Sequence, residues 1–278
     1  MSRHWGRYIG ASAIALAAAA SAHPGYADSF LPNLTNLNFT KMSGTPKCSF
    51  SSCGETGWTG GSGLIYIDGQ AYNQSAAGGG YLTTYGNPVG SVTGNYVEAD
   101  GNPYFESGFD YKVTGLTPGE TYTLDFYQGA SQQVGFVGTT TNQWVVSLGT
   151  SGLYVASTSD PSAPDNSCGK TCGYYSTDKN ASIVTSPLMT VPTGTTVGWE
   201  YVQLTLTADA TTDFLSFLAW GDNGNTTNLP PIAFLSGVNS PSGLGAPVPE
   251  PSSLMLLGVG LAGFAAIMRR RGKRSAAG

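Results

Sequence analysis

The central region of the chain, from residue 28 to residue 250, contains neither histidine nor arginine. Both histidines, His4 and His23, lie in or beside an N-terminal segment with the features of an export signal. Without an imidazole, the region cannot build a Ser-His-Asp or Cys-His catalytic group or a histidine-ligated metal site. No catalytic residue is therefore assigned, and we do not expect an enzyme.

Positive charge is equally scarce in this region. It holds five lysines and all 17 acidic residues of the chain, which gives a net charge of −12. A surface this acidic repels phosphate backbones, so nucleic acid is not expected as a partner. The same charge favours solubility outside the cell and attracts Ca²⁺.

Long uncharged apolar runs occur only at the two ends of the chain. At the N-terminus two arginines precede the apolar segment 9–20, and small residues that suit signal-peptidase cleavage end at Ala22 or Ala27. This order predicts an export signal over residues 1–27, with an N-terminal membrane anchor as the alternative.

Three segments follow one another at the C-terminus. Pro249, Glu250 and Pro251 precede an uncharged apolar run over 254–268, and a basic cluster over 269–274 follows. Apolar residues prefer lipid, and a cationic flank stays on the cytoplasmic side of a membrane. The pattern predicts a short transmembrane helix; a buried helix of a soluble domain is the alternative. The cluster begins with three arginines: Arg269, Arg270 and Arg271.

This tail, residues 249–274, resembles the PEP-CTERM sorting signal of exported bacterial proteins. The resemblance implies an exosortase-type membrane protease as a partner, which cuts near Pro-Glu-Pro, and transient anchoring in the inner membrane before that cut. It also implies a product of the cell envelope, the cell surface or the extracellular matrix.

The four cysteines form two close pairs, Cys48 with Cys53 and Cys168 with Cys172. In an exported protein, an even number of cysteines at short spacing predicts disulfides. Closing such a small loop gains only about 2 kcal/mol, so each disulfide is expected to be a local clip in a surface loop. A zinc site of four thiolates and cross-pairing between the loops are the alternatives.

Helical periodicity is absent before the C-terminal run. Short segments with period-two alternation, bounded by Gly, Pro, Asn and Asp, predict an all-β chain. Residues 30–40 are expected to form the first strand. The spacing favours a two-sheet antiparallel β-sandwich of jelly-roll type over residues 28–238, followed by a linker over 239–248.

Two local features are predicted within this sandwich. The segments 144–148 and 153–156 are expected to pair as a hairpin, followed by a long exposed loop over 157–182. The step from Leu116 to Tyr122 contains Pro-Gly and is typical of a sandwich corner, where the tyrosine hydroxyl returns to the backbone.

Several stretches, among them 95–101, 113–124 and 215–221, look like exported bacterial β-sandwich proteins that carry the same tail. They are similar to galactose-binding-like jelly rolls. The resemblance implies a fold rather than an activity.

Carbohydrate recognition is the first candidate function. Sugars stack their apolar ring faces on aromatic side chains, while amides and carboxylates bind their hydroxyls. The aromatic residues in or beside predicted loops are Trp58, Tyr72, Tyr81, Tyr85, Tyr104, Tyr174 and Tyr175. Among them, Trp58, Tyr104, Tyr174 and Tyr175 are chosen as the candidate ligand-binding residues. The other tryptophans are expected in the core: Trp144, Trp199 and Trp220.

Calcium is the one cofactor for which the sequence offers candidates. Two stretches place hard oxygen ligands close together: Glu98, Asp100 and Asn102 in one, and Asp222, Asn223 and Asn225 in the other. Ordinary turn chemistry explains the same residues and is the favoured interpretation.

The expected function is that of a structural or adhesive protein of the cell surface or matrix that binds exopolysaccharide. The alternative is a secreted glycoside hydrolase or another polysaccharide-modifying enzyme. It would need two carboxylates about 5–9 Å apart. The candidates are Glu98, Asp100, Glu106, Asp110 and Glu200.

Overall fold

The structure, a computed structural model, describes residues 30–238 with gaps at 36–37, 44–47, 62, 70–81, 87, 89–91, 93, 106–107, 163, 166, 169–170 and 222–229. The predicted export signal, linker and sorting tail lie outside the described residues. Within these ranges, the only helix is the single turn α1 (Phe50–Cys53). No helix of the described part is long and apolar enough to cross a membrane.

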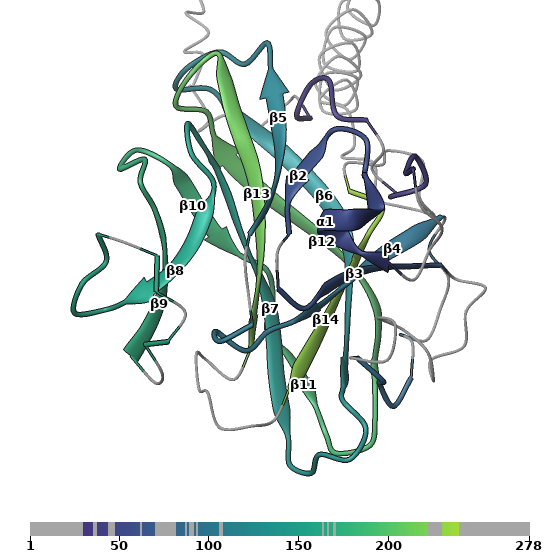
Figure 1. Ribbon diagram of the computed structural model, residues 1–278. Coiled ribbons are helices and arrows are strands. Elements are labelled where there is room, and N and C mark those ends of the chain that lie inside the picture. The colour runs from purple at the N-terminus through teal and green to yellow at the C-terminus, as the bar shows by residue number, and fades with distance from the viewer. Residues whose placement is uncertain are drawn as a thin grey trace, which may run out of the picture.

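Two antiparallel sheets form a sandwich (Figure 1). Sheet A contains, in spatial order, β1 (Cys48–Ser49), β3 (Ile65–Gly69), β4 (Asn95–Asp100), β14 (Pro231–Ser236), β6 (Thr121–Gln132) and β12 (Val197–Thr207). Sheet B contains β10 (Ser182–Thr185), β7 (Thr140–Gly149), β13 (Thr212–Gly221), β5 (Phe109–Thr114) and β2 (Trp58–Gly60), and β11 (Met189–Val191) also pairs with β7. The predicted all-β, two-sheet antiparallel sandwich is confirmed.

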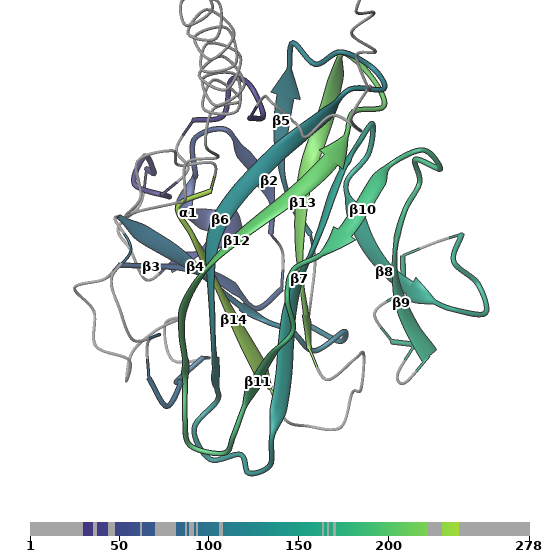
Figure 2. The same ribbon diagram turned by 180° about the vertical axis from the view of Figure 1, so that it is seen from behind.

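A third, two-stranded sheet is the hairpin of β8 (Leu153–Ser157) and β9 (Cys172–Ser176). Figures 1 and 2 show this hairpin on the side of the molecule opposite β3 and β4. It is an addition to the sandwich, and the candidate site is built on it.

The core lies between sheets A and B and is filled by the side chains that point inward at every second position of the strands. In β13, Leu215 and Phe217 face this core, while Leu218 faces the opposite side of sheet B. Each buried side chain of this size contributes roughly 1.5–3 kcal/mol. The indole N–H of Trp144 in sheet B donates to the carbonyl of Phe234 in sheet A at 3.1 Å, so a hydrogen bond also joins the two sheets.

The predicted corner at the start of β6 is confirmed. The backbone N–H of Thr117 donates to the Tyr122 hydroxyl at 2.9 Å. Gly119 has a φ of +83°, which glycine adopts without the steric cost that other residues incur. The corner was predictable because the Pro-Gly turn and the hydrogen bond that define it lie within six residues of sequence, from Thr117 to Tyr122.

Two strand predictions are wrong. The described residues of 30–40 form turns rather than a strand, and Asn33 and Phe39 have positive φ values of 58° and 52°, which a strand does not allow. Segment 144–148 lies in β7 and pairs with β13 and β10, while segment 153–156 pairs with β9. The expected hairpin between them does not form because β7 is taken up on both edges by sheet B.

Candidate functional site

The β8–β9 hairpin has two different faces. Val155 lies opposite Tyr174 in the register, and Tyr154 lies opposite Tyr175. Val155 and Tyr174 pack in a cluster with Leu218 of β13 on the outer side of sheet B. Because directly opposed residues share a face, Tyr154 and Tyr175 lie on the face directed away from the sandwich.

Ser216 anchors the hairpin to sheet B. The backbone N–H of Leu153 donates to Ser216 Oγ at 3.0 Å, and the Ser216 side chain is hydrogen-bonded to Asp110. Burial raises the pKa of Asp110, and the bond from Ser216 partly offsets that rise. A Cβ on Gly152 would lie 2.6 Å from both Asp110 carboxylate oxygens, so glycine is required where the chain enters β8.

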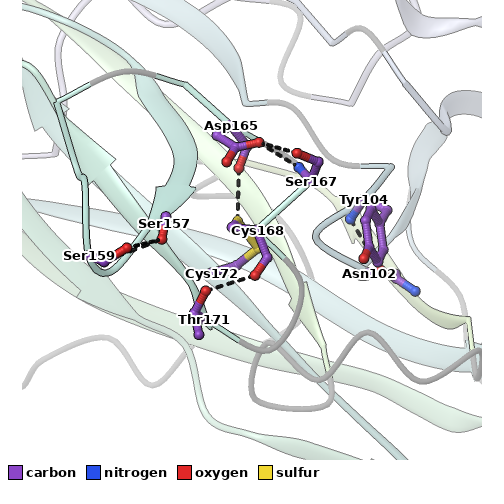
Figure 3. The surroundings of a disulfide bond; sticks show 9 residues. All are labelled: Asn102, Tyr104, Ser157, Ser159, Asp165, Ser167, Cys168, Thr171 and Cys172. Carbon is purple, nitrogen blue, oxygen red and sulfur yellow. Dashed lines mark hydrogen bonds between the residues drawn. A yellow bond between two sulfur atoms is a disulfide. The ribbon is translucent and has the colours of Figure 1, made fainter.

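A disulfide joins Cys168 to Cys172 at the start of β9 (Figure 3). In the loop before it, Ser167 donates to Asp165 Oδ1 through its N–H at 2.8 Å and its hydroxyl at 2.6 Å. These bonds lower the pKa of Asp165, and Ser162 does the same for Asp160. Both carboxylates are exposed and ionised at neutral pH, so they can accept hydrogen bonds from a ligand.

Both disulfide predictions are confirmed, since Cys48 is bonded to Cys53 and Cys168 to Cys172. The described chain has no free cysteine. The zinc and cross-paired alternatives are thereby excluded for this structure.

Three of the four predicted aromatic residues belong to the hairpin or lie near it. Tyr174 is half-buried and meets Trp220 edge to face, with ring centroids 5.3 Å apart. Tyr175 lies on the outward face with its ring 6.1 Å from that of Tyr154. Tyr104 is 44% exposed, and Figure 3 shows it in the surroundings of the Cys168–Cys172 disulfide.

The expectation for Trp58 is corrected. Its side chain is only 5% exposed and packs against Phe39 and Phe109 in the main core. The residue follows a Gly-rich loop, but it starts β2, whose alternation turns its ring inward. Among the tryptophans expected in the core, Trp144 and Trp220 are buried, whereas Trp199 is partly exposed.

Sequence reasoning missed Tyr154 and Phe105. Segment 153–156 was predicted as one strand of a hairpin, and Tyr154 was not named as a candidate, although alternation within this segment separates it from its buried neighbours. Its hydroxyl donates to the carbonyl of Pro161 at 2.6 Å, which holds the ring beside Tyr175. Phe105 is 47% exposed and follows Tyr104 directly.

A second aromatic face lies on β6 and β12 of sheet A. The rings of Tyr127 and Tyr201 are 5.6 Å apart, and the Tyr201 hydroxyl donates to Asp125 Oδ2 at 3.0 Å. Burial, followed by the bond to Asp125, raises the pKa of Tyr201 to about 12. The Tyr201 hydroxyl is therefore already engaged within the protein.

The structure assigns Asp100 and Asn102 to a turn. Asp100 Oδ1 accepts the N–H of Asn102 at 2.8 Å, and Asn102 Oδ1 accepts the N–H of Tyr104 at 3.1 Å. These bonds present Tyr104 on the surface. Three calcium candidates lie outside the described residues: Asp222, Asn223 and Asn225. Across the described ranges, no group of three or more His, Cys, Asp or Glu side chains is close enough to hold a metal.

The carboxylates proposed for hydrolysis are spread over the fold. Glu98 and Asp100 lie on β4 and are almost completely buried, Asp110 lies on β5 in sheet B, and Glu200 is exposed on β12. Glu106 lies outside the described residues. A substrate in solution would not reach Glu98 or Asp100, so these two do not form an accessible catalytic pair.

Comparisons with known proteins identify the tail. Residues 247–271 match the model of the PEP-CTERM protein-sorting motif, which confirms the sorting signal predicted from Pro249, Glu250 and Pro251. Such a motif indicates an exported protein that is sorted to the cell surface. No curated protein matches the chain.

Several solved structures are distantly similar. They include an arabinose-bound α-L-arabinofuranosidase (13% identity, 74% of this chain and 26% of that one, TM-score 0.35). A family 16 carbohydrate-binding module is 16% identical over 68% of this chain and 94% of that one, with a TM-score of 0.29. A structure of CBM4 is 15% identical over 73% of this chain and 96% of that one, with a TM-score of 0.30. The chain spans about a quarter of the length of the arabinofuranosidase (26%).

Proposed function

We propose that the protein is exported, sorted through its C-terminal tail by an exosortase, and retained at the cell surface or in the extracellular matrix, where it binds polysaccharide. The binding surface, called the hairpin surface below, consists of Tyr154 and Tyr175 on the outward face of the hairpin. The observation that carries the proposal is that these tyrosines lie on one disulfide-clipped hairpin that adds nothing to the main core.

The hairpin surface has the chemistry that sugar binding requires. Aromatic rings supply apolar platforms, and each well-placed ring contact contributes about 0.5–1.5 kcal/mol. The ionised carboxylates of Asp160 and Asp165 stand in the adjoining loop and can accept hydrogen bonds from sugar hydroxyls. The disulfide restricts that loop before binding, which lowers the entropic cost of forming a complex.

The charge of the domain narrows the ligand class. A net charge of −12 between residues 28 and 250 repels strongly anionic polymers. Neutral or amino-sugar polysaccharides therefore fit this domain better than polyuronates or sulfated chains.

Affinity electrophoresis of the mature protein in gels containing defined neutral, cationic and anionic polysaccharides tests the proposal. Tyr175→Ala should weaken retardation by about 3- to 10-fold, as the loss of one ring contact predicts. Tyr85→Ala is the matched control. Tyr85 is also an exposed tyrosine, 36% accessible, but its hydroxyl donates to the carbonyl of Phe136 at the β6–β7 turn, outside the hairpin. Retardation that is equal for both variants and the unaltered protein would contradict the assignment of the hairpin surface.

A further inference from the structure

A second buried region lies on the outer side of sheet A. In the register, Glu98 of β4 lies between Tyr66 of β3 and Phe234 of β14, so the three side chains share one face. The apolar residues of this face form a cluster separate from the main core: Tyr66, Leu82, Tyr96, Ile232 and Phe234, with Leu64 and Trp199 packed against them. Glu98 is therefore an acidic residue set in an apolar enclosure.

Glu98 has no hydrogen-bond partner there. Its side chain is 0% exposed, and neither carboxylate oxygen bonds to another group in the described structure. A buried carboxylate without hydrogen bonds or a counter-charge is strongly disfavoured. Native proteins rarely contain such a group unless a bound ion, an ordered water or a proton compensates it.

A second carboxylate adds to the negative charge. Asp68 of β3 is 1% exposed and lies diagonal to Glu98 on the same face, since it pairs with Tyr96. Burial, and after it the negative charge of Asp68, raises the pKa of Glu98 well above its ordinary value. The three lysines in the described ranges, Lys41, Lys112 and Lys179, are all exposed, so none is buried beside this pair.

We propose that Asp68 and Glu98 bind a divalent cation, with Ca²⁺ the best fit. Two carboxylates carry the two negative charges that one such ion neutralises, and carboxylate oxygens are the ligands that Ca²⁺ prefers. The unpartnered, fully buried Glu98 is what points to a ligand, because an acidic pair alone does not. The exported location suits this ion, since extracellular modules bind Ca²⁺ with dissociation constants of about 10⁻⁴–10⁻³ M.

This site shares Glu98 with one of the calcium candidates that the sequence offered, but its second carboxylate is Asp68 of β3 rather than Asp100. Asp100 follows Glu98 by two residues, but its Oδ1 accepts the N–H of Asn102 in a turn. The proposed ion would instead join β3 to β4, two strands that the chain links through residues 70–94. Its expected effect is to stabilise sheet A rather than to take part in polysaccharide binding.

Terbium luminescence and thermal unfolding of the chelator-treated mature protein test the proposal. Tb³⁺ replaces Ca²⁺ and is sensitised by nearby rings, here Tyr66, Tyr96 and Trp199. We expect a Tb³⁺ signal that Ca²⁺ displaces, and a rise in Tm of roughly 5–10 °C at a Ca²⁺ concentration 100 times the dissociation constant. Glu98→Gln should abolish both responses while leaving the Tm of the ion-free protein equal or higher.

Glu200→Gln is the matched control, because Glu200 is an exposed carboxylate on β12 of the same sheet; it should keep the full Ca²⁺ response. If Glu98→Gln fails to fold, Asp68→Asn and the wild-type titration still decide the question. Wild-type protein that gives neither a Tb³⁺ signal nor a Tm shift would overturn the proposal, and Glu98 would then be protonated instead. A Ca²⁺ response that survives in Glu98→Gln would also overturn it, since the ion would bind elsewhere.

Discussion

The attachment of the hairpin to sheet B yields the sharpest stability prediction. Ser216 Oγ accepts the N–H of Leu153 and is hydrogen-bonded to Asp110. Ser216→Ala removes both bonds, so the buried N–H of Leu153 and the partly buried carboxylate of Asp110 each lose one partner. Each loss costs about 1–3 kcal/mol, so together they amount to roughly 2–6 kcal/mol.

Ser147 offers a matched control in the same row of side chains. It lies directly opposite Ser216 on β7 and is fully buried, but its hydroxyl has no hydrogen-bond partner in the described structure. Ser147→Ala removes an unsatisfied group and should be neutral or stabilising by up to about 1 kcal/mol. Both substitutions remove a serine hydroxyl. A difference in their free energies of unfolding therefore measures the contribution of the hydrogen bonds that Ser216 makes.

Urea unfolding and amide hydrogen exchange measure the two effects. Ser216→Ala is expected to lower the free energy of unfolding and to speed exchange in β8 and β9 more than in β6 and β13, because the hairpin loses its attachment first. Equal stabilities for the two serine variants, or unchanged exchange in the hairpin, would show that Ser216 does not anchor it.

Three further predictions concern the corner, the second aromatic face and the tail. Tyr122→Phe should cost about 0.5–1.5 kcal/mol in urea unfolding, because the N–H of Thr117 loses its acceptor. Burial raises the pKa of Asp125 above 3.8. The stability that Asp125 contributes is therefore complete below pH 3.8 and is lost as the pH rises through the raised pKa. Asp125→Asn should remove this loss from the pH dependence of the free energy of unfolding. Glu250→Ala should leave export intact but block sorting, so that fractionation finds uncut protein in the membrane; wild-type cleavage of this variant would argue against a role for Glu250.

The sequence was informative where structure depends on near neighbours in the chain. Period-two alternation predicted the all-β fold, because strands such as β6 and β12 turn every second side chain toward the core. The corner at Tyr122 and the disulfides Cys48–Cys53 and Cys168–Cys172 involve short separations, which spacing and turn chemistry specify. The tail was recognisable because the order of its three segments is itself the signal.

The errors arose where tertiary pairing decides the outcome. Period-two alternation marks 153–156 as a strand, but it does not say that β9, from a predicted loop, is its partner. Trp58 follows a loop, and only its pairing with Tyr111 in sheet B shows that its ring is buried. The isolation of Glu98 could not be predicted either, because it depends on what β3 and β14 place around it.

The central claim is that polysaccharide binds at the hairpin surface, and amide hydrogen exchange of the mature protein with and without its best polysaccharide ligand tests it most directly. The account predicts that binding slows exchange in 153–157 and 172–176, while β6 and β12 stay unchanged. Protection confined to the face of Tyr127 and Tyr201, with none in the hairpin, would contradict it.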